Sequence, residues 1–232
     1  MAKMRFKAIL FDLDGTILDI LDRDAFARCQ ALKDLGYDAS LEEIRKHYRY
    51  GTGMNGVTEK LGIRMTEEET RKYIELGFAY FMKKEASRLT RIHSGAYEVL
   101  SALYGKYKLV VVTSRDTLSS AEEDLERFNV RKFFSLIVTR EVAAKFYGIE
   151  EIPLLPFQEQ RTKLYECAIG LTQISPEDML CIGDSVSELE PAQKLRMKTI
   201  GVLTGFSSKE NMQTSHIATI QDITQLMRIL KQ

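Results

Sequence analysis

With 232 residues, 44% of them hydrophobic, the chain can bury the core of one large domain or of a core domain with a smaller insert. Its 33 basic and 33 acidic side chains cancel, so no overall charge favours a nucleic acid or an anionic membrane as partner. We expect neither a leader segment nor a membrane span, because the longest apolar runs fall far short of about 20 residues. The cysteines Cys29, Cys167 and Cys181 lack metal-ligand spacing. Together these features predict a soluble cytoplasmic protein with buried, reduced thiols. We expect a monomer or a homodimer, a choice that the sequence does not make.

Five short apolar runs indicate the strands of a parallel sheet. They are rich in Ile, Leu and Val, hardly alternate with polar residues, and are separated by helical patterns. Strands of this kind are typical of an α/β fold in which helices cover both faces of the sheet. The predicted strands are Lys7–Phe11, Leu109–Val112, Leu136–Val138, Met179–Ile182 and Thr199–Leu203.

The interval between the first two strands is mostly helical and far exceeds a usual crossover. We interpret residues Leu18–Ser87 as an inserted helical subdomain, which leaves residues 1–17 and 88–232 for the core. A helix beginning near Gly95–Ser101 returns the chain to this core.

Local signals mark where several helices begin and end. Helix starts are indicated by two capping boxes, Ser40 with Glu43 and Thr66 with Glu69, and by Ser175 followed by the first-turn proline Pro176. Helix ends are indicated by two glycines suited to C-terminal caps, Gly36 and Gly62. A glycine-rich stretch from Tyr48 to Gly56 predicts a break inside the helical insert.

Polar residues follow four of the five predicted strands, at the edge where parallel α/β sheets bind ligands. These segments are Asp12-Leu13-Asp14-Gly15-Thr16, Thr113-Ser114-Arg115-Asp116, Gly183-Asp184-Ser185 and Thr204-Gly205. Carboxylates that meet there repel one another unless a cation lies among them, and Mg²⁺ prefers hard oxygen ligands. We therefore expect Mg²⁺ near Asp12 and Asp184, with Glu188 four residues beyond Asp184.

Three of these segments resemble motifs of the haloacid dehalogenase superfamily. "DLDGT" at Asp12–Thr16 is similar to the first motif, "VVVTS" at Val110–Ser114 to the second and "CIGDSVSELE" at Cys181–Glu190 to the fourth. They occur in the family's order, each at the end of a predicted strand, and the helical insert lies between the first two. The resemblance is to the family's phosphoglycolate-phosphatase-like members. It implies a Rossmann-like parallel sheet core with an inserted α-helical cap.

The resemblance implies a catalytic role for two carboxylates. Asp12 would attack phosphorus to form an aspartyl-phosphate, and Asp14 would protonate the leaving alcohol and then activate the hydrolytic water. Their period-2 spacing suits this pairing, because it directs both side chains to one side of a strand. The family's dehalogenases lack the second acid, so Asp14 favours phosphoryl transfer.

The same resemblance implies how phosphate and metal are bound. Gly15 would let the backbone turn towards the phosphate, and Thr113 with the Ser114 amide would bind the phosphoryl group. The implied Mg²⁺ ligands are Asp12, the Asp14 carbonyl and Asp184, with Glu188 standing where the family usually has Asp.

The family's third motif, a lysine often followed by proline, has no clear match. Lys145, Arg161 and Lys163 are the candidates for the phosphate-binding cation. If a helix runs over about Phe157–Leu171, Arg161 faces the sheet. If it begins later, with Thr162 as N-cap, Lys163 lies at its mouth. Lys163 is the first choice, because the family's cation is a lysine, and Arg161 is the second.

These expectations combine into a Mg²⁺-dependent phosphomonoester hydrolase for a small phosphorylated metabolite, phosphoglycolate-, sugar- or nucleotide-like. A phosphomutase of the same family shares the core motifs and differs in how its cap excludes water. A catalytically silent relative that binds a phosphorylated ligand or a protein partner is the other alternative. In simpler interpretations Asp12 and Asp14 belong to a strand-end turn and Asp184 caps a helix.

Overall fold

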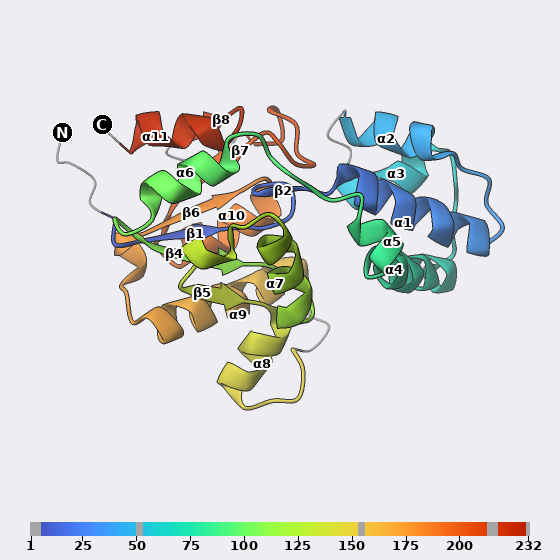
Figure 1. The fold of residues 1–232 in the computed structure, drawn as a ribbon. Coiled ribbons are helices and arrows are strands. Elements are labelled where there is room, and N and C mark those ends of the chain that lie inside the picture. The colour runs from blue at the N-terminus through green and yellow to red at the C-terminus, as the bar shows by residue number, and fades with distance from the viewer. Residues whose placement is uncertain (1–5, 50–52, 153–155, 213–217, 231–232) are drawn as a thin grey trace.

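The computed structural model describes residues 6–49, 53–152, 156–212 and 218–230. Within these ranges it contains a six-stranded sheet, parallel throughout, in the order β5-β4-β1-β6-β7-β8 (Figure 1). The strands are β1 (Ala8–Phe11), β4 (Lys108–Val112), β5 (Leu136–Val138), β6 (Met179–Gly183), β7 (Lys198–Val202) and β8 (Ala218–Ile220). The predicted α/β class and all five predicted strands are confirmed. The sequence analysis missed β8, a three-residue edge strand with one buried position.

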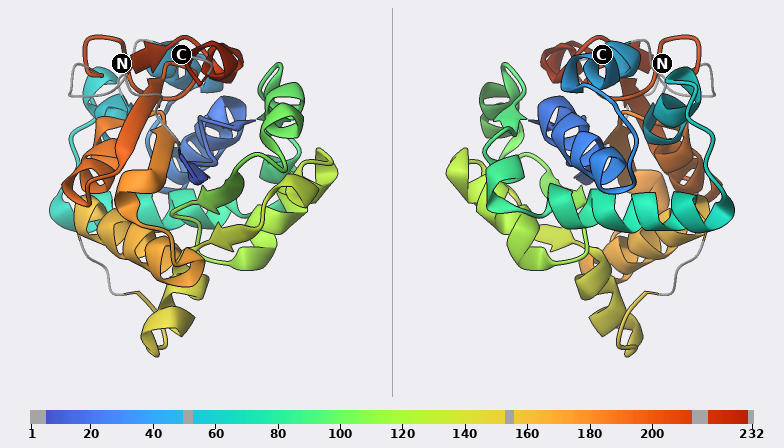
Figure 2. Two further views of the ribbon diagram at one scale, coloured as in Figure 1. Left: turned by 90° about the vertical axis from the view of Figure 1, so that its left-hand side faces the viewer. Right: turned by 90° about the vertical axis from the view of Figure 1, so that its right-hand side faces the viewer.

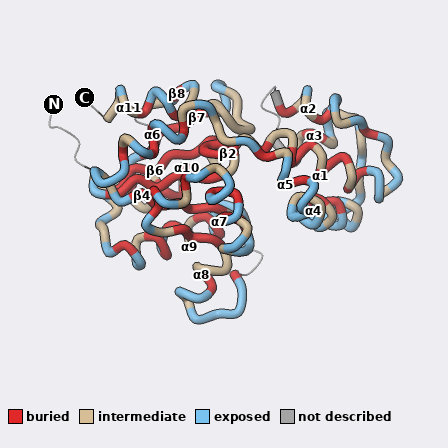
Figure 3. The backbone as a smooth tube through the Cα atoms, in the orientation of Figure 1, coloured by how far each residue is buried: buried red, intermediate tan, exposed pale blue. Residues whose placement is uncertain are grey.

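Helices cover both faces of this sheet, so its strands form the buried centre of the molecule (Figure 3). Alternate residues of β1 enter different apolar clusters, with Ile9 and Phe11 on one face and Ala8 and Leu10 on the other. The first face packs against α6 (Ala96–Leu103), α7 (Leu118–Arg127) and α11 (Leu226–Ile229). The second packs against α8 (Arg140–Tyr147), α9 (Phe157–Thr172) and α10 (Val186–Lys194). Apolar strands without alternation are thus explained by burial on both sides.

A separate group of helices lies beside the sheet core in Figure 1, and the side views of Figure 2 show it behind the core and in front of it. It contains α1 (Leu21–Asp34), α2 (Leu41–Arg49), α3 (Gly53–Lys60), α4 (Glu67–Phe81) and α5 (Lys84–Ser87). The group has its own buried cluster, which includes Leu32, Ile44 and Tyr73. Two short antiparallel strands, β2 (Leu18–Asp19) and β3 (Arg91–Ile92), pair where the chain leaves the core and returns to it. The predicted helical insert falls on this group, whereas its limits at residues 18 and 87 stay a prediction.

Most of the local signals act as expected. Ser40 and Glu43 exchange backbone and side-chain hydrogen bonds, and so do Thr66 and Glu69. Gly36 and Gly62 have positive φ angles of 82° and 71° just after helix ends, where glycine avoids strain. The three cysteines are free and buried, as predicted.

Two local expectations need correction. Ser175 and Pro176 take the expected N-cap and first-turn positions, but the segment forms only a short 3₁₀ helix (Pro176–Asp178) without a hydrogen bond from the serine side chain, and β6 follows at Met179. Of the glycine-rich stretch, Tyr48 and Arg49 belong to α2 and Gly53–Gly56 to α3, while residues 50–52 lie outside the described residues. Among the helices that the structure describes, none is both long and apolar enough to cross a membrane.

Candidate active site

Three neighbouring strands end at one edge of the sheet with buried polar side chains. Asp12 follows β1, Thr113 follows β4, and Asp184 follows β6; their exposed fractions are 3%, 1% and 3%. Since β1 lies between β4 and β6, these side chains are adjacent in space although far apart in sequence. The backbone continues the ladder one step beyond β1, where the Asp12 N–H donates to the Ile182 carbonyl at 2.8 Å. The register of the sheet therefore places Asp12 between its two neighbours.

Asp12, Asp184 and Glu188 form an acidic cluster, with one carboxylate oxygen from each within 4.8 Å of the others. Burial, followed by repulsion from Glu188, raises the pKa of both Asp12 and Asp184; Arg161 opposes the shift at Asp12, and the Phe206 N–H opposes it at Asp184. Asp12 Oδ2 and Glu188 Oε2 are buried without a hydrogen-bond partner among the described residues. Hard oxygens that repel one another and lack donors are the ligand set that a divalent cation satisfies. The residues present thus fit a metal ion.

The walls around Asp184 come from the segment after β7, to which the sequence analysis gave no role. The Phe206 N–H donates to Asp184 Oδ2 at 2.9 Å, and the Thr204 hydroxyl donates to the Gly15 carbonyl at 2.7 Å. A Cβ on Gly205 would lie 1.7 Å from Asp184 Oδ2. Gly15 has φ +88°, and a Cβ there would lie 2.6 Å from the same oxygen. Both glycines leave the room that the Asp184 carboxylate occupies.

Arg161 supplies positive charge to this edge of the sheet. It lies on α9, is fully shielded from solvent, and brings Nη2 to 3.3 Å from Asp12 Oδ1. Nη2 also donates to the Tyr165 hydroxyl at 3.0 Å, and Nη1 lies 3.5 Å from Ser114 Oγ. The Tyr165 hydroxyl in turn accepts from the Cys181 thiol at 3.2 Å. Sequence reasoning missed Tyr165, although its position one helical turn after Arg161 could have indicated it.

The other two candidate cations lie elsewhere. Lys163, the first choice from the sequence, has Nζ 5.0 Å from the centre of the Tyr147 ring. Lys145 pairs with Glu141 on the exposed side of α8. Because α9 begins at Phe157 rather than after Thr162, Arg161 faces the sheet and Lys163 points about 200° away. The structure thus brings Arg161, and neither lysine, to Asp12.

Asp14 does not join the acidic cluster with its side chain. Both of its oxygens face Arg115, whose Nε donates to Oδ2 at 2.9 Å and Nη2 to Oδ1 at 2.6 Å. The N–H of Arg115 also donates to the Thr113 hydroxyl at 3.3 Å. Arg115 was visible in the sequence after Thr113-Ser114, but no motif assigned it a role.

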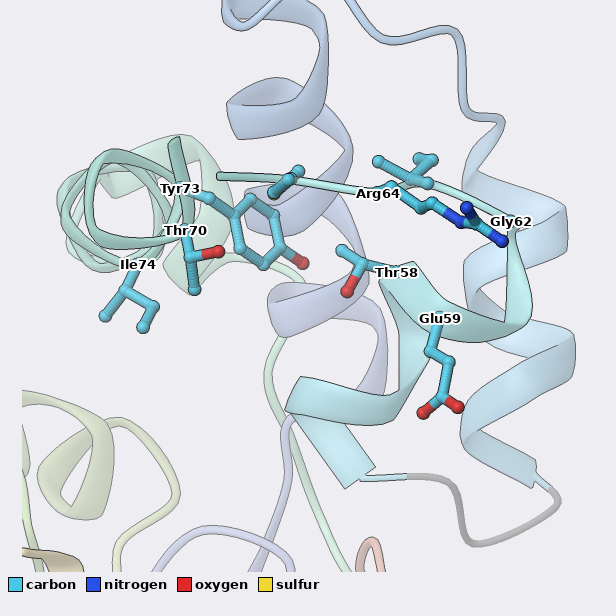
Figure 4. Close-up of a pocket in the computed structure, with 9 residues that line it drawn as sticks. Thr58, Glu59, Gly62, Arg64, Thr70, Tyr73 and Ile74 are labelled. Atoms are coloured by element: carbon cyan, nitrogen blue, oxygen red, sulfur yellow. The ribbon is translucent and has the colours of Figure 1, made fainter. Parts of the chain in front are cut away.

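A hollow of about 720 Å³ lies between α3 and α4 (Figure 4). All of its lining residues lie between Thr58 and Ile74, and the Tyr73 and Thr58 side chains approach one another across it. None of the acidic-cluster residues lines it, so it is separate from the candidate active site.

The protein is an α/β protein with a parallel sheet, an acidic cluster suited to a metal ion at one edge of that sheet, and a helical insert after β1. Comparison with family models makes the class specific. Residues 9–146 match the model described as haloacid dehalogenase-like hydrolase, and residues 161–226 match a second HAD-hydrolase-like model. The chain belongs to the haloacid dehalogenase-like hydrolase family.

Individual relatives span nearly the whole chain at low identity. The chain is 23% identical over 238 residues to a phosphoglycolate phosphatase of Vibrio parahaemolyticus, covering 99% of this chain and 98% of that protein. It is 22% identical over 241 residues to a glyceraldehyde 3-phosphate phosphatase of Pyrococcus furiosus, covering 98% and 94%. A haloacid dehalogenase-like hydrolase from Streptococcus pneumoniae superposes with a TM-score of 0.77 at 18% identity, covering 97% and 98%. The predicted likeness to phosphoglycolate phosphatases is confirmed, while the relatives differ in the substrates for which they are named.

Proposed function

We propose that the protein is a phosphatase that hydrolyses a small phosphate monoester through an aspartyl-phosphate on Asp12, with Mg²⁺ as cofactor. The observation that carries the proposal is the environment of Asp12. One of its oxygens faces the buried Arg161. The other has no hydrogen-bond partner among the described residues, and the carboxylate lies next to those of Asp184 and Glu188. A carboxylate that pairs with a fixed cation and belongs to a cluster suited to a metal ion can attack a phosphate dianion, because both positive charges offset the repulsion.

Asp12 acts as the nucleophile in this proposal. It must be ionised to attack phosphorus, and the Arg161 guanidinium favours the ionised form and offsets repulsion by the substrate. When bound, Mg²⁺ supplies positive charge that neutralises the acidic cluster and the transferred oxygens. Its proposed ligands are Asp12, Asp184, the Asp14 carbonyl and Glu188.

Asp14 supplies the proton transfers. It lies two residues after Asp12 in the turn that follows β1, and its side chain keeps a fifth of its surface exposed. From that position it protonates the leaving alcohol and then takes a proton from the water that hydrolyses the aspartyl-phosphate.

Phosphate binding falls to Thr113, the Ser114 amide and the turn at Gly15. Arg161 takes the place of the family's third-motif lysine, since Lys163 lies against Tyr147. The Ser114 hydroxyl, 3.5 Å from Arg161 Nη1, lies on the same side of Asp12 as the guanidinium.

We also propose that residues 18–87 form the cap and that residues 1–17 with 88–232 form the catalytic core. The Tyr48 ring of α2 contacts the Phe206 ring of the core, with centroids 5.1 Å apart, so the helical group reaches the segment that borders Asp184. A cap in this position would select among phosphoglycolate-, sugar- and nucleotide-like esters. The cytoplasmic location and the monomeric or dimeric state stay predictions.

A panel of phosphate esters tests the proposal. Purified protein with Mg²⁺ should release inorganic phosphate from at least one of phosphoglycolate, sugar phosphates, nucleotides or p-nitrophenyl phosphate, and an Asp12→Asn variant should not. Conversion of a sugar phosphate to its isomer without phosphate release would favour a phosphomutase. Absence of turnover across the panel would favour a ligand-binding relative.

A further inference from the structure

Arg115 forms a bidentate ion pair with Asp14, the candidate acid–base residue. Nε and Nη2 donate in parallel to the two oxygens of Asp14, at 2.9 and 2.6 Å. The Arg115 side chain is only 4% exposed, whereas that of Asp14 is 20% exposed. A two-pronged pair of this kind fixes the plane of a carboxylate as well as its position, which a lysine ammonium cannot do.

The third nitrogen of Arg115 is also fixed. Nη1 donates to the Ser120 carbonyl and to Asp124 Oδ2, both at 2.7 Å. Asp124 lies on α7 and is itself buried, and it accepts further hydrogen bonds from Arg23 at 2.7 Å and Arg127 at 2.9 Å. All three nitrogens of Arg115 are therefore engaged, and the guanidinium has no alternative position without breaking buried hydrogen bonds.

Asp14 needs such a support because of where it lies. It belongs to the turn after β1, and the last torsion of an aspartate side chain is broad and poorly defined when nothing holds it. Proton transfer requires a carboxyl oxygen within about 2.6–3.2 Å of the reacting atom. Because each oxygen of Asp14 accepts from a different nitrogen of Arg115, the pair fixes both the position and the plane of the carboxylate.

We infer that Arg115 is a positioning residue that sets the orientation of the Asp14 carboxylate for proton transfer, with Asp124 as its buried anchor. This inference rests on the acid–base role proposed for Asp14. Arg23 extends the support to the helical insert, because its Nε donates to the Phe81 carbonyl at 2.9 Å while Nη1 reaches Asp124. The orientation of Asp14 is thus tied to α1 and α4 as well as to the core.

The test compares two leaving groups. An alkyl phosphate needs a proton on its departing oxygen, whereas 2,4-dinitrophenyl phosphate releases a stable phenolate without one. In Arg115→Lys, which keeps the charge but loses the fork, we expect kcat for the alkyl ester to fall about a hundredfold with KM little changed. The pre-steady-state release of dinitrophenolate should stay within about threefold of the wild-type rate. The matched control is Arg131→Lys, since Arg131 pairs with Glu122 and has no contact with Asp14; it should leave both rates unchanged.

An equal loss of rate with both esters, or no loss with either, would overturn the inference. A crystal structure of Arg115→Gln gives a second readout that does not depend on turnover: the Asp14 carboxylate should leave its present orientation. If Asp14 stays in place without the guanidinium, Arg115 does not position it. If the wild-type protein hydrolyses neither ester, the proposed function fails, and the crystal structure still decides the role of Arg115.

Discussion

The guanidinium of Arg161 lies 3.3 Å from the carboxylate of Asp12, and both side chains are almost completely shielded from solvent. A buried charge is costly unless it is paired, so each of these groups stabilises the other. The same nitrogen, Nη2, donates to the Tyr165 hydroxyl, and Nη1 lies 3.5 Å from Ser114 Oγ, so both groups help to hold the cation beside Asp12. The pair accounts for how a negative nucleophile could meet a negative substrate.

Replacing Arg161 by Met should lower kcat about a hundredfold, because the variant loses a fixed charge beside the nucleophile. The variant should also unfold at lower urea, since Asp12 is left buried without its partner. Lys163→Met is the matched control, as it removes a cation two residues away that contacts only the Tyr147 ring among the interactions described. Steady-state kinetics of both variants would decide the matter, and an equal loss in Lys163→Met would refute the assignment.

The contrast between Arg161 and Lys163 shows what the sequence could and could not predict. Helical spacing correctly put Arg161 on the sheet-facing side of a helix over Phe157–Leu171. The preference for Lys163 came from the family's lysine and from a possible later helix start at Thr162. Whether Lys163 lies at the start of the helix or well inside it depends on where the helix begins, and sequence patterns rarely fix helix ends that closely.

The same limit applies to the rest of the site. Apolar runs predicted five strands, and their order along the chain predicted which polar residues meet at the carboxyl edge. The fork between Arg115 and Asp14 and the close approach of Gly205 to Asp184 depend on loop conformations. Loop conformations are set by tertiary contacts that leave no periodic pattern in the sequence.

Asp12→Asn should abolish turnover while preserving the fold, because an amide fits the same space but cannot attack phosphorus. The expected loss of kcat is at least about a thousandfold, as for removal of a covalent nucleophile. Circular dichroism and urea unfolding check the fold, and trapping of labelled phosphate on acid-quenched protein checks the intermediate. Turnover within about tenfold of wild type would remove Asp12 from the role.

Chelation should abolish activity, and Mg²⁺ should restore it. The cluster of Asp12, Asp184 and Glu188 offers few, closely placed oxygens, which suit six short bonds shared with water. Ca²⁺ prefers more ligands and longer bonds, so an excess of it should inhibit rather than replace Mg²⁺. Phosphate release is measured with EDTA and after each metal is added back. Unchanged activity in EDTA would contradict the metal site.

His93 should make stability depend on pH near neutrality. Burial lowers the pKa of this imidazole below its ordinary value of 6.5, although Asp19, the Gly15 backbone and Asp222 act in the opposite direction. The folded state therefore binds this proton less well than the unfolded chain. The stabilising contribution of neutral His93 is complete above about pH 6.5 and is lost as the pH falls towards its folded pKa.

A His93→Gln variant should consequently lose less of its free energy of unfolding than wild type between about pH 8 and about pH 5.5. Urea titrations of both proteins at the two pH values, all in EDTA, measure the difference. Both proteins contain the same carboxylates. If the free energy of unfolding changes equally with pH in both, His93 does not contribute.

Gly205→Ala should damage the metal site through a single methyl group. The new Cβ would lie 1.7 Å from Asp184 Oδ2 and 2.2 Å from its Cγ, so the carboxylate has to move. Asp184 is 3% exposed and is held by the Phe206 N–H, and a shift therefore breaks a buried hydrogen bond as well as the acidic cluster. We expect Mg²⁺ activation to weaken at least tenfold and the free energy of unfolding to fall by about 1–3 kcal/mol.

Gly36→Ala is the control: its φ of +82° is strained for alanine, but a Cβ there meets no described atom within 4 Å. It should cost about 1 kcal/mol and leave Mg²⁺ activation unchanged. Mg²⁺ titrations of activity and urea unfolding of both variants separate steric loss at Asp184 from general destabilisation. Wild-type Mg²⁺ activation in Gly205→Ala would show that Asp184 does not hold the metal in the position inferred.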